Sequence, residues 1–228
     1  MTTNRREFIE RIGATAMLGA LPLSALGPAS SMMAETMTPA QGQKWDFSWT
    51  AKLKGKKHLA CFDCAEIESG YGIWRAGMWE GQYQEALGAK PSEFRTVLVL
   101  RHAALVLGFQ QEFWDKYGIG AQDKVTHPIT QQATDKNPAL LSSSRNEIPA
   151  MFDNFALPHF IAHGGVVLAC NVALQFFSAG LATKAGITPE EARTRAVAAL
   201  LPGVTLMPSG VFACVKAQDE GCHYVRAS

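Results

Sequence analysis

Residues 166–174 read Val-Val-Leu-Ala-Cys-Asn-Val-Ala-Leu, an apolar run that ends in a cysteine and is followed by a polar asparagine and a second apolar pattern. The β-branched run Val166–Ala169 is typical of a strand buried on both faces. The pattern that begins at Val172 predicts a helix over 172–184. Cys170 and Asn171 therefore lie at a turn from a strand into a helix.

The same alternation of strand and helix continues along the chain. Strands are predicted at 58–62, 96–100, 166–169, 204–207 and 222–225, and helices at 67–87, 103–117, 152–163, 172–184, 189–200 and 209–220. Parallel strands joined by helices form right-handed crossovers, which place helices on both faces of one sheet. The sequence therefore predicts an α/β fold, a single three-layer sandwich of about five mostly parallel strands.

The composition excludes several classes of protein. The 228 residues are 47% hydrophobic and 18% charged, with a formal net charge of +1, as in ordinary globular proteins. Because no basic or acidic block is present, we expect no nucleic-acid partner. The chain also lacks a glycine-rich phosphate loop, a Gly-x-Ser-x-Gly elbow and a His-Glu-x-x-His helix.

The first residues are typical of an export signal. Arg5 and Arg6 precede a modestly apolar stretch, 12–26, which glycines interrupt. This stretch is too short for a stable membrane span, which needs roughly 20 apolar residues. The paired arginines resemble a bacterial twin-arginine signal. We therefore expect a signal peptide at 1–34, a partner in the twin-arginine export machinery, and a periplasmic or otherwise exported location.

Three further segments follow the predicted signal. Residues 35–55 are polar and are predicted to be a leader segment. Residues 56–228 are enough for one hydrophobic core and too few for two, so they are predicted to form one domain. Within it, the polar stretch 118–149 is unusually long for a loop, and such loops are commonly either disordered or placed over a functional site.

Reactive or turn-forming residues follow four consecutive predicted strands. They are Cys61 with Cys64, Arg101-His102, Cys170-Asn171, and Pro208-Ser209-Gly210. In an open parallel sheet the carboxyl ends of the strands converge on the ligand site. At Cys170 the start of a helix would also stabilise a thiolate, which is the nucleophilic form of cysteine. A small buried cysteine with no chemical role explains the same position equally well.

The Cys61-x-x-Cys64 motif has three interpretations. It is typical of a redox dithiol, of a disulfide in an oxidising compartment, or of half a metal site. A structural zinc ion takes four ligands, and Cys170 and His102 could complete a Cys3His set with this pair. The five cysteines of the chain are an odd number, so at least one thiol is unpaired within it.

The last third of the sequence carries a recognisable set of stretches, namely 165–173, 201–204 and 208–211 with Gln218 and Glu220-Gly221. Together they resemble the DsrE-like family of small sulfur-relay domains, and Val97–Leu100 with His102 fits the second strand of that family. The resemblance covers roughly residues 56–227, with 118–149 as an insertion. It implies a five-stranded parallel α/β fold, frequent oligomerisation, and a cysteine after the third strand that carries sulfur as a persulfide. Cys170 occupies that place.

The leading hypothesis is an exported DsrE-like protein with thiol, persulfide or disulfide chemistry at the strand ends. Cys170 would be the nucleophile or sulfur carrier, Cys61 and Cys64 a resolving dithiol, and His102 a base or a stabiliser of the thiolate. The expected partners are a second copy of the chain and a sulfur donor or acceptor protein. One alternative is a periplasmic module that holds a metal ion or small ligand at these four residues without turnover, and another is an oligomeric scaffold.

Overall fold

The computed structural model describes residues 44–228 of the chain, so the predicted twin-arginine signal with Arg5 and Arg6 lies outside the described residues. Its strands form one five-stranded sheet in the order β4-β3-β2-β1-β5, and every pair of neighbours is parallel. The strands are β1 (His58–Cys64), β2 (Phe94–Leu100), β3 (Val166–Cys170), β4 (Val204–Met207) and β5 (His223–Arg226). The predicted α/β class and parallel sheet are confirmed.

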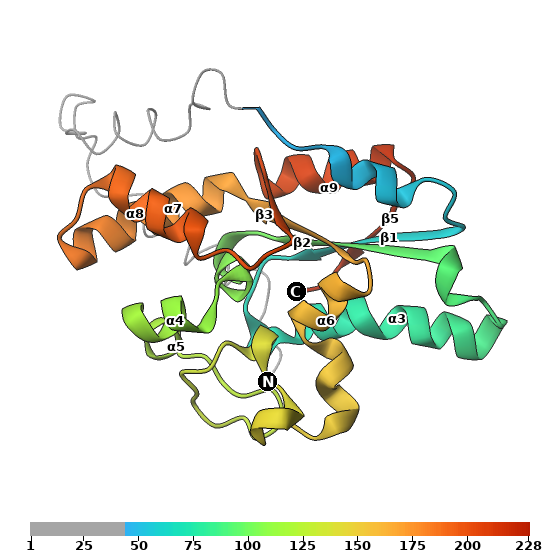
Figure 1. Ribbon diagram of the computed structural model, residues 1–228, viewed down its shortest axis with the longest axis horizontal. Helices are drawn as coiled ribbons and strands as arrows, with labels where there is room; N and C mark the ends of the chain where they lie inside the picture. Colours follow the sequence, from blue (N-terminus) through green and yellow to red (C-terminus); the bar gives the residue numbers. More distant parts are fainter. Residues whose placement is uncertain (1–43) are drawn as a thin grey trace, which may run out of the picture. The chain divides into compact units, whose positions relative to one another are not determined.

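Helices cover both faces of this sheet (Figure 1). The α-helices are α3 (Tyr71–Leu87), α4 (Gln111–Tyr117), α5 (Ile119–Gln122), α6 (Leu157–Ala162), α7 (Asn171–Ala185), α8 (Pro189–Ala198) and α9 (Gly210–Asp219). Short 3-10 helices are η2 (Ser48–Leu53), η3 (Glu68–Gly70), η4 (Pro91–Glu93), η5 (His102–Gly108), η6 (Pro138–Leu140), η7 (Ser143–Arg145) and η8 (Ala150–Phe155). In Figure 1, α9 and η2 lie above the sheet, and α3, α6 and η8 lie below it.

The alternation of side chains along each strand builds two separate apolar cores. On the face covered by α3, the core includes Phe62, Leu98 and Leu100. On the face covered by α9, Val97 and Val99 pack with residues of α9 and η2. We call these the α3 face and the α9 face. Their two layers of helices and the sheet between them form the predicted three-layer sandwich.

The predicted leader segment contributes to the domain. Within 35–55, residues Ser48–Leu53 form η2, whose Trp49 and Leu53 are buried in the core of the α9 face. The polar composition around these two side chains concealed them in the sequence. The folded domain therefore begins before residue 56.

The predicted helix at 103–117 is broken in two. Residues 102–108 form η5, and α4 starts only at Gln111. Between them the chain bends to pair with the segment after α8: Gln110 N–H donates to Ala199 O, and Leu201 N–H donates to Gly108 O. These two long-range hydrogen bonds compete with helical ones, which explains why the helical spacing of apolar residues did not produce one helix.

The long segment 118–149 is folded against the α3 side of the domain. It contains α5, η6 and η7, and η6 contacts both η3 and η5. Asn137, fully buried, donates from its side chain to Leu107 O at 3.1 Å and to Phe109 O at 2.8 Å. Because a buried amide with two such bonds is costly to release, these contacts hold the segment in place.

Candidate functional site

The candidate site lies at the carboxyl ends of β1, β2 and β3, beside the N-terminus of α9. Ala169 packs on the α3 face, so the next side chain, Cys170, lies on the α9 face. Leu100 is paired with Ala169, so Arg101 directly follows β2 at the level where Cys170 ends the neighbouring strand β3. The predicted convergence of the strand ends thus brings Arg101 and Cys170 to one face.

Cys170 forms the N-cap of the fifteen-residue helix α7. Its backbone is extended, and its sulfur accepts a hydrogen bond from the N–H of Ala173 at 3.3 Å. The residue is 5% exposed. The sulfur thus takes up one of the N–H groups that an α-helix leaves unpaired at its start. This N–H would also stabilise a negative charge on the sulfur.

Arg101 is held by a carboxylate that sequence reasoning missed. Its Nε and Nη2 donate to the two oxygens of Asp63 at 2.6 and 2.9 Å, and Tyr224 Oη donates to Asp63 Oδ2 at 2.7 Å. Arg101 also lies against α9 where Gly210 stands, because a Cβ at that glycine would be 2.5 Å from the Cβ of Arg101. The ion pair therefore fixes the guanidinium between β1 and the start of α9.

The ion pair shifts the titration of its members. Burial alone would raise the pKa of Asp63, but the hydrogen bonds from Arg101 and Tyr224 and the charge of Arg101 outweigh it, so that pKa lies below its usual value. The same hydrogen bond to the carboxylate raises the pKa of Arg101, and the bond from Tyr224 raises the pKa of that phenol to about 12. Asp63 is therefore ionised at neutral pH.

The lowered pKa of Asp63 predicts that the wild type loses stability in acid more steeply than a variant without this carboxylate. The contribution of Asp63 is fully present above the pKa of an unfolded aspartate, about 3.9, and is lost as the pH falls through the lower pKa of the folded state. We expect the urea midpoint of the wild type to fall more between pH 5 and pH 2, about where this proton binds, than that of Asp63→Asn. Parallel curves for the two proteins would contradict this assignment.

The structure separates the two cysteines of the C-x-x-C motif. β1 continues to residue 64, so Cys61 lies inside the strand, and residues three apart in a strand point to opposite faces. Cys61 is in the core of the α9 face, and Cys64 is in the core of the α3 face. The predicted dithiol or disulfide between them is therefore not formed, and all five thiols are free and buried.

Each of these two thiols has a different neighbour. Cys61 packs in the same core as Cys214 of α9, and the interaction with that thiol together with burial raises the pKa of Cys61. Cys64 lies under the start of α3, close to Gly72, and burial raises its pKa to about 11. Both thiols are therefore protonated and out of contact with solvent at neutral pH, as packing residues are.

Two glycines of α3 provide a test of the packing around Cys64. A Cβ at Gly72 would collide with Cys64 Sγ, whereas a Cβ at Gly81 would meet nothing within 4 Å. We expect Gly72→Ala to lower the free energy of unfolding by about 1–3 kcal/mol through overpacking. Gly81→Ala, the matched control in the same helix, is expected to raise it by about 0.5–1 kcal/mol. Equal effects in chemical denaturation would show that Cys64 does not pack as described.

His102 follows Arg101 and is exposed, with a left-handed backbone of φ 49°. Its ring has no hydrogen-bond partner among residues 44–228. Over the same residues, no group of three or more His, Cys, Asp or Glu side chains is arranged to hold a metal ion. The Cys3His set expected from Cys61, Cys64, His102 and Cys170 is therefore not assembled, because β1 places its two cysteines on opposite faces.

Asp63 and Tyr224 are the members of this site that sequence reasoning missed. Asp63 is a charged residue within an apolar strand, and burying a charge is costly unless it is paired, so its position was a usable indication of a buried partner. Tyr224 gave no such indication. Its hydroxyl reaches Asp63 from a strand that lies 161 residues further along the chain.

Comparisons with protein family models, curated proteins and solved structures found no match to this chain. None of the helices in residues 44–228 combines the length and the apolar character that crossing a membrane requires.

Proposed function

We propose that this chain is an exported DsrE-like sulfur carrier in which Cys170 is the residue that holds sulfur. The observation that supports it most directly is the position of the Cys170 sulfur, at the carboxyl end of the third strand of a five-stranded parallel sheet and within hydrogen-bonding distance of a helix N–H. The other four thiols lie within the strand β1, within α9, or just before β5, and none caps a helix.

The proposed reaction is a transfer of sulfane sulfur without net oxidation. The Cys170 thiolate attacks the outer sulfur of a donor persulfide, R–S–SH. The new bond joins Cys170 to that outer sulfur, the S–S bond of the donor breaks, and the donor leaves as a thiolate. A thiolate of the acceptor then attacks the outer sulfur of the Cys170 persulfide and releases the Cys170 thiolate.

Within this proposal, the residues around Cys170 have distinct roles. The N–H of Ala173 stabilises negative charge on the Cys170 sulfur. Arg101, whose side chain is 24% exposed, supplies a positive charge on the same face, where it can stabilise the thiolate that the donor becomes as it leaves, and Asp63 positions it. His102, exposed beside Arg101, stays the proposed base for the incoming thiol. Cys61 and Cys64 have no role in the transfer, since both thiols are fully buried inside β1 and out of reach of a donor.

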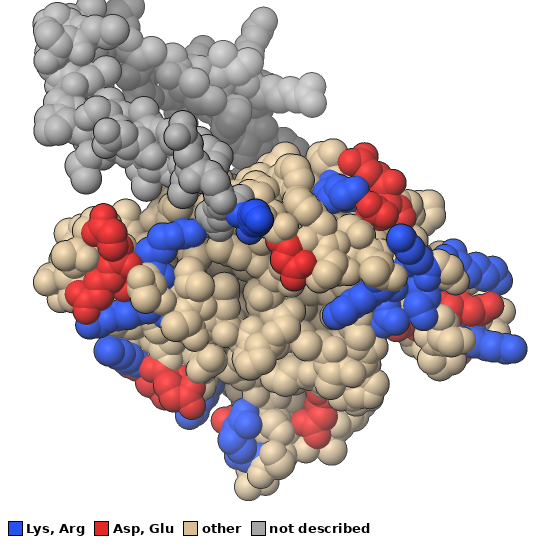
Figure 2. Space-filling view, turned by 45° about the horizontal axis from the view of Figure 1, so that its top comes forward, with Lys and Arg blue, Asp and Glu red and all other residues tan. Residues whose placement is uncertain are grey.

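The proposal includes a second copy of the chain and a donor or acceptor protein as partners. Three apolar residues of α9, Val211, Phe212 and Val215, are exposed on the outer surface of that helix. Figure 2 turns the α9 side toward the viewer and shows charged side chains mainly around the margin, with uncharged residues over most of the middle. An uncharged, partly apolar surface supports contact with another protein.

Cysteine alkylation tests the proposal, because Cys170 and Cys222 are each 5% exposed. Burial raises the pKa of Cys222 to about 11, whereas the sulfur of Cys170 receives a helix N–H. We expect iodoacetamide at neutral pH to modify Cys170 at least about tenfold faster, because only thiolates react and burial keeps the Cys222 thiol protonated. Peptide mass spectrometry over a time course measures both rates in one sample. Equal rates, or a faster reaction at Cys222, would contradict a functional thiol at Cys170.

A further inference from the structure

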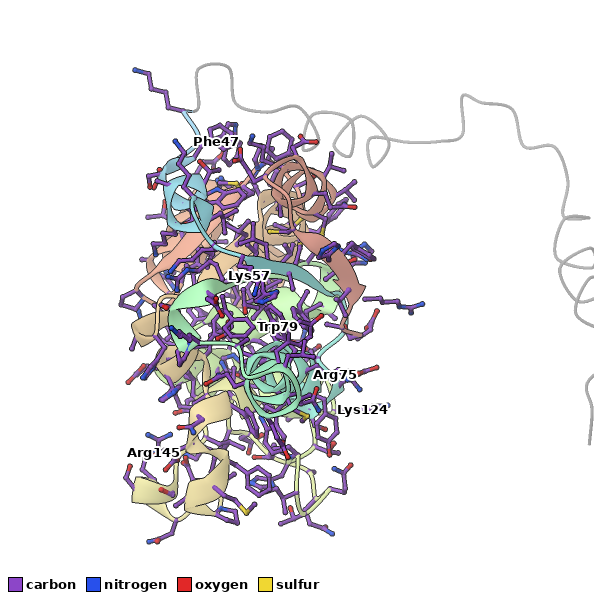
Figure 3. All side chains as sticks on the ribbon, turned by 90° about the vertical axis from the view of Figure 1, so that its right-hand side faces the viewer. Phe47, Lys57, Arg75, Trp79, Lys124 and Arg145 are labelled. Atoms are coloured by element: carbon purple, nitrogen blue, oxygen red, sulfur yellow. The ribbon has the colours of Figure 1, made fainter. Side chains whose placement is uncertain are left out.

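A pocket of about 410 Å³ lies on the α3 face, at the edge of the sheet formed by β1 and β5. Its walls include Lys57, His58, Met78, Trp79, Tyr83 and Val225. Figure 3 looks at this side of the molecule, with Trp79 between the sheet and α3 and with Lys57 beside it. The volume is within the range of about 300–1,000 Å³ that is usual for small-molecule sites.

The pocket exists because the edge strand is shorter than its neighbour. β5 pairs only with Ala60–Asp63, so the first residues of β1, His58 and Leu59, have no strand beside them on the β5 side and pair only with β2 on the other. Trp79 and Tyr83 of α3 are packed edge to face, with ring centroids 5.3 Å apart. This contact holds their rings in place, and such preformed aromatic walls lose little entropy when a flat ligand binds.

The pocket is mainly apolar, and the charged residues that line it are cations. Met78, Tyr83 and Val225 are all exposed there, although large apolar side chains usually are not. Two of the twelve lining residues are cations, Lys57 and Arg75, and none is an aspartate or glutamate. An apolar ligand that carries one negative charge complements both properties.

Of the two cations, Lys57 is the one available to a ligand. Arg75 already donates to Glu68 at 2.7 Å and to Ala227 O. Lys57 is 68% exposed, and its nearest carboxylate oxygen, on Glu93, is 4.0 Å away, at the limit of an ion pair. Because this exposed ion pair contributes little free energy, a carboxylate in the pocket can replace Glu93 as the partner of Lys57.

We propose that this pocket binds a small amphipathic anion, an aromatic carboxylic acid whose ring lies against Trp79 and Tyr83 and whose carboxylate pairs with Lys57. The pocket is separate from the Cys170 site. It lies on the α3 face along the amino-terminal half of β1, whereas the side chain of Cys170 is on the α9 face at the carboxyl end of β3. The binding proposal therefore stands whether or not Cys170 carries sulfur.

Calorimetric titration of the mature chain with 2-naphthoate tests the proposal, with 2-naphthalenemethanol as the neutral analogue. We expect saturable binding of the acid and an affinity at least about tenfold lower for the alcohol, because only the acid can pair with Lys57. Lys57→Glu is expected to weaken acid binding about tenfold or more. Lys54→Glu makes the same change in charge at an exposed lysine outside the pocket, and is expected to alter binding less than about twofold.

A second variant tests the apolar wall. Met78 is exposed, so Met78→Asp is expected to fold normally while placing a carboxylate against the ligand, which would reduce acid binding at least as much as Lys57→Glu. Thermal unfolding confirms that each variant is folded. A dissociation constant for 2-naphthoate above about 1 mM, or no saturable binding at all, overturns the proposal. It is equally overturned by similar affinities for the acid and the alcohol, or by equal losses in Lys57→Glu and Lys54→Glu.

Discussion

Asp63→Ala is expected to lower the free energy of unfolding by about 3 kcal/mol, because it leaves a partly buried guanidinium without its counter-charge. Asp63 is 3% exposed and accepts hydrogen bonds from Arg101 and Tyr224. Breaking a buried pair by removing one partner costs about 3–5 kcal/mol. The lower end applies here because Arg101 keeps some contact with water, which can solvate the unpaired charge.

A second acid–arginine pair provides the control for this variant. Glu68 and Arg75 are also 2.7 Å apart, but both side chains are close to half exposed. Exposed pairs of this kind contribute about 0–1 kcal/mol, so Glu68→Ala is expected to change the stability by no more than that. Urea unfolding of the two variants and the wild type measures the difference. If both substitutions have the same small effect, the ion pair at Asp63 does not hold the site together.

Cys170→Ala is expected to abolish the acquisition of sulfur from a persulfide donor. The thiols of Cys61 and Cys64 are fully buried, and burial raises the pKa of Cys64 and of Cys222 to about 11. These protonated thiols are poor nucleophiles and cannot replace Cys170. The matched control is Cys222→Ala, which is expected to acquire sulfur as the wild type does. Sulfur on the Cys170→Ala chain at wild-type levels would show that another thiol is the carrier.

The stability of the same variant separates a functional thiol from a packing residue. Cys170→Ala removes the hydrogen bond that caps α7, and the loss of a cap costs about 1 kcal/mol. A scaffold in which Cys170 only packs predicts this small loss of stability and no change in reactivity. The sulfur-carrier proposal predicts the same loss of stability together with the complete loss of sulfur acquisition. Only the measurement of sulfur acquisition therefore separates the two hypotheses.

The apolar runs of the sequence predicted the sheet because they are buried on both faces in a parallel sheet. Residues 204–207 form β4 as expected, and β3 extends the expected strand by one residue, to Cys170. The site was predicted less completely. The expected end of the first strand at 62 would have placed Cys61 next to the strand end and Cys64 in the turn after it, whereas β1 continues to residue 64 and puts the two side chains on opposite faces. A shift of two residues in a strand end decided this outcome.

The remaining differences arise from contacts between distant parts of the chain. Tyr224 and Asp63 are 161 residues apart in the sequence, and no local sequence pattern predicts a hydrogen bond between them. Trp49 and Leu53 are buried only because α9 and the sheet lie beside η2. The helix expected at 103–117 is broken by hydrogen bonds to residues 199 and 201. Periodicity reports which residues prefer burial, and it cannot report these pairings.

The most direct test of the central claim is the mass of the wild-type protein after incubation with a persulfide donor, followed by peptide mapping. The account predicts the mass of one added sulfur atom, located on the peptide that contains Cys170 and removed by a reducing agent. A chain that gains no sulfur, or one that carries it on Cys61, Cys64, Cys214 or Cys222 while Cys170 stays a free thiol, would contradict the account.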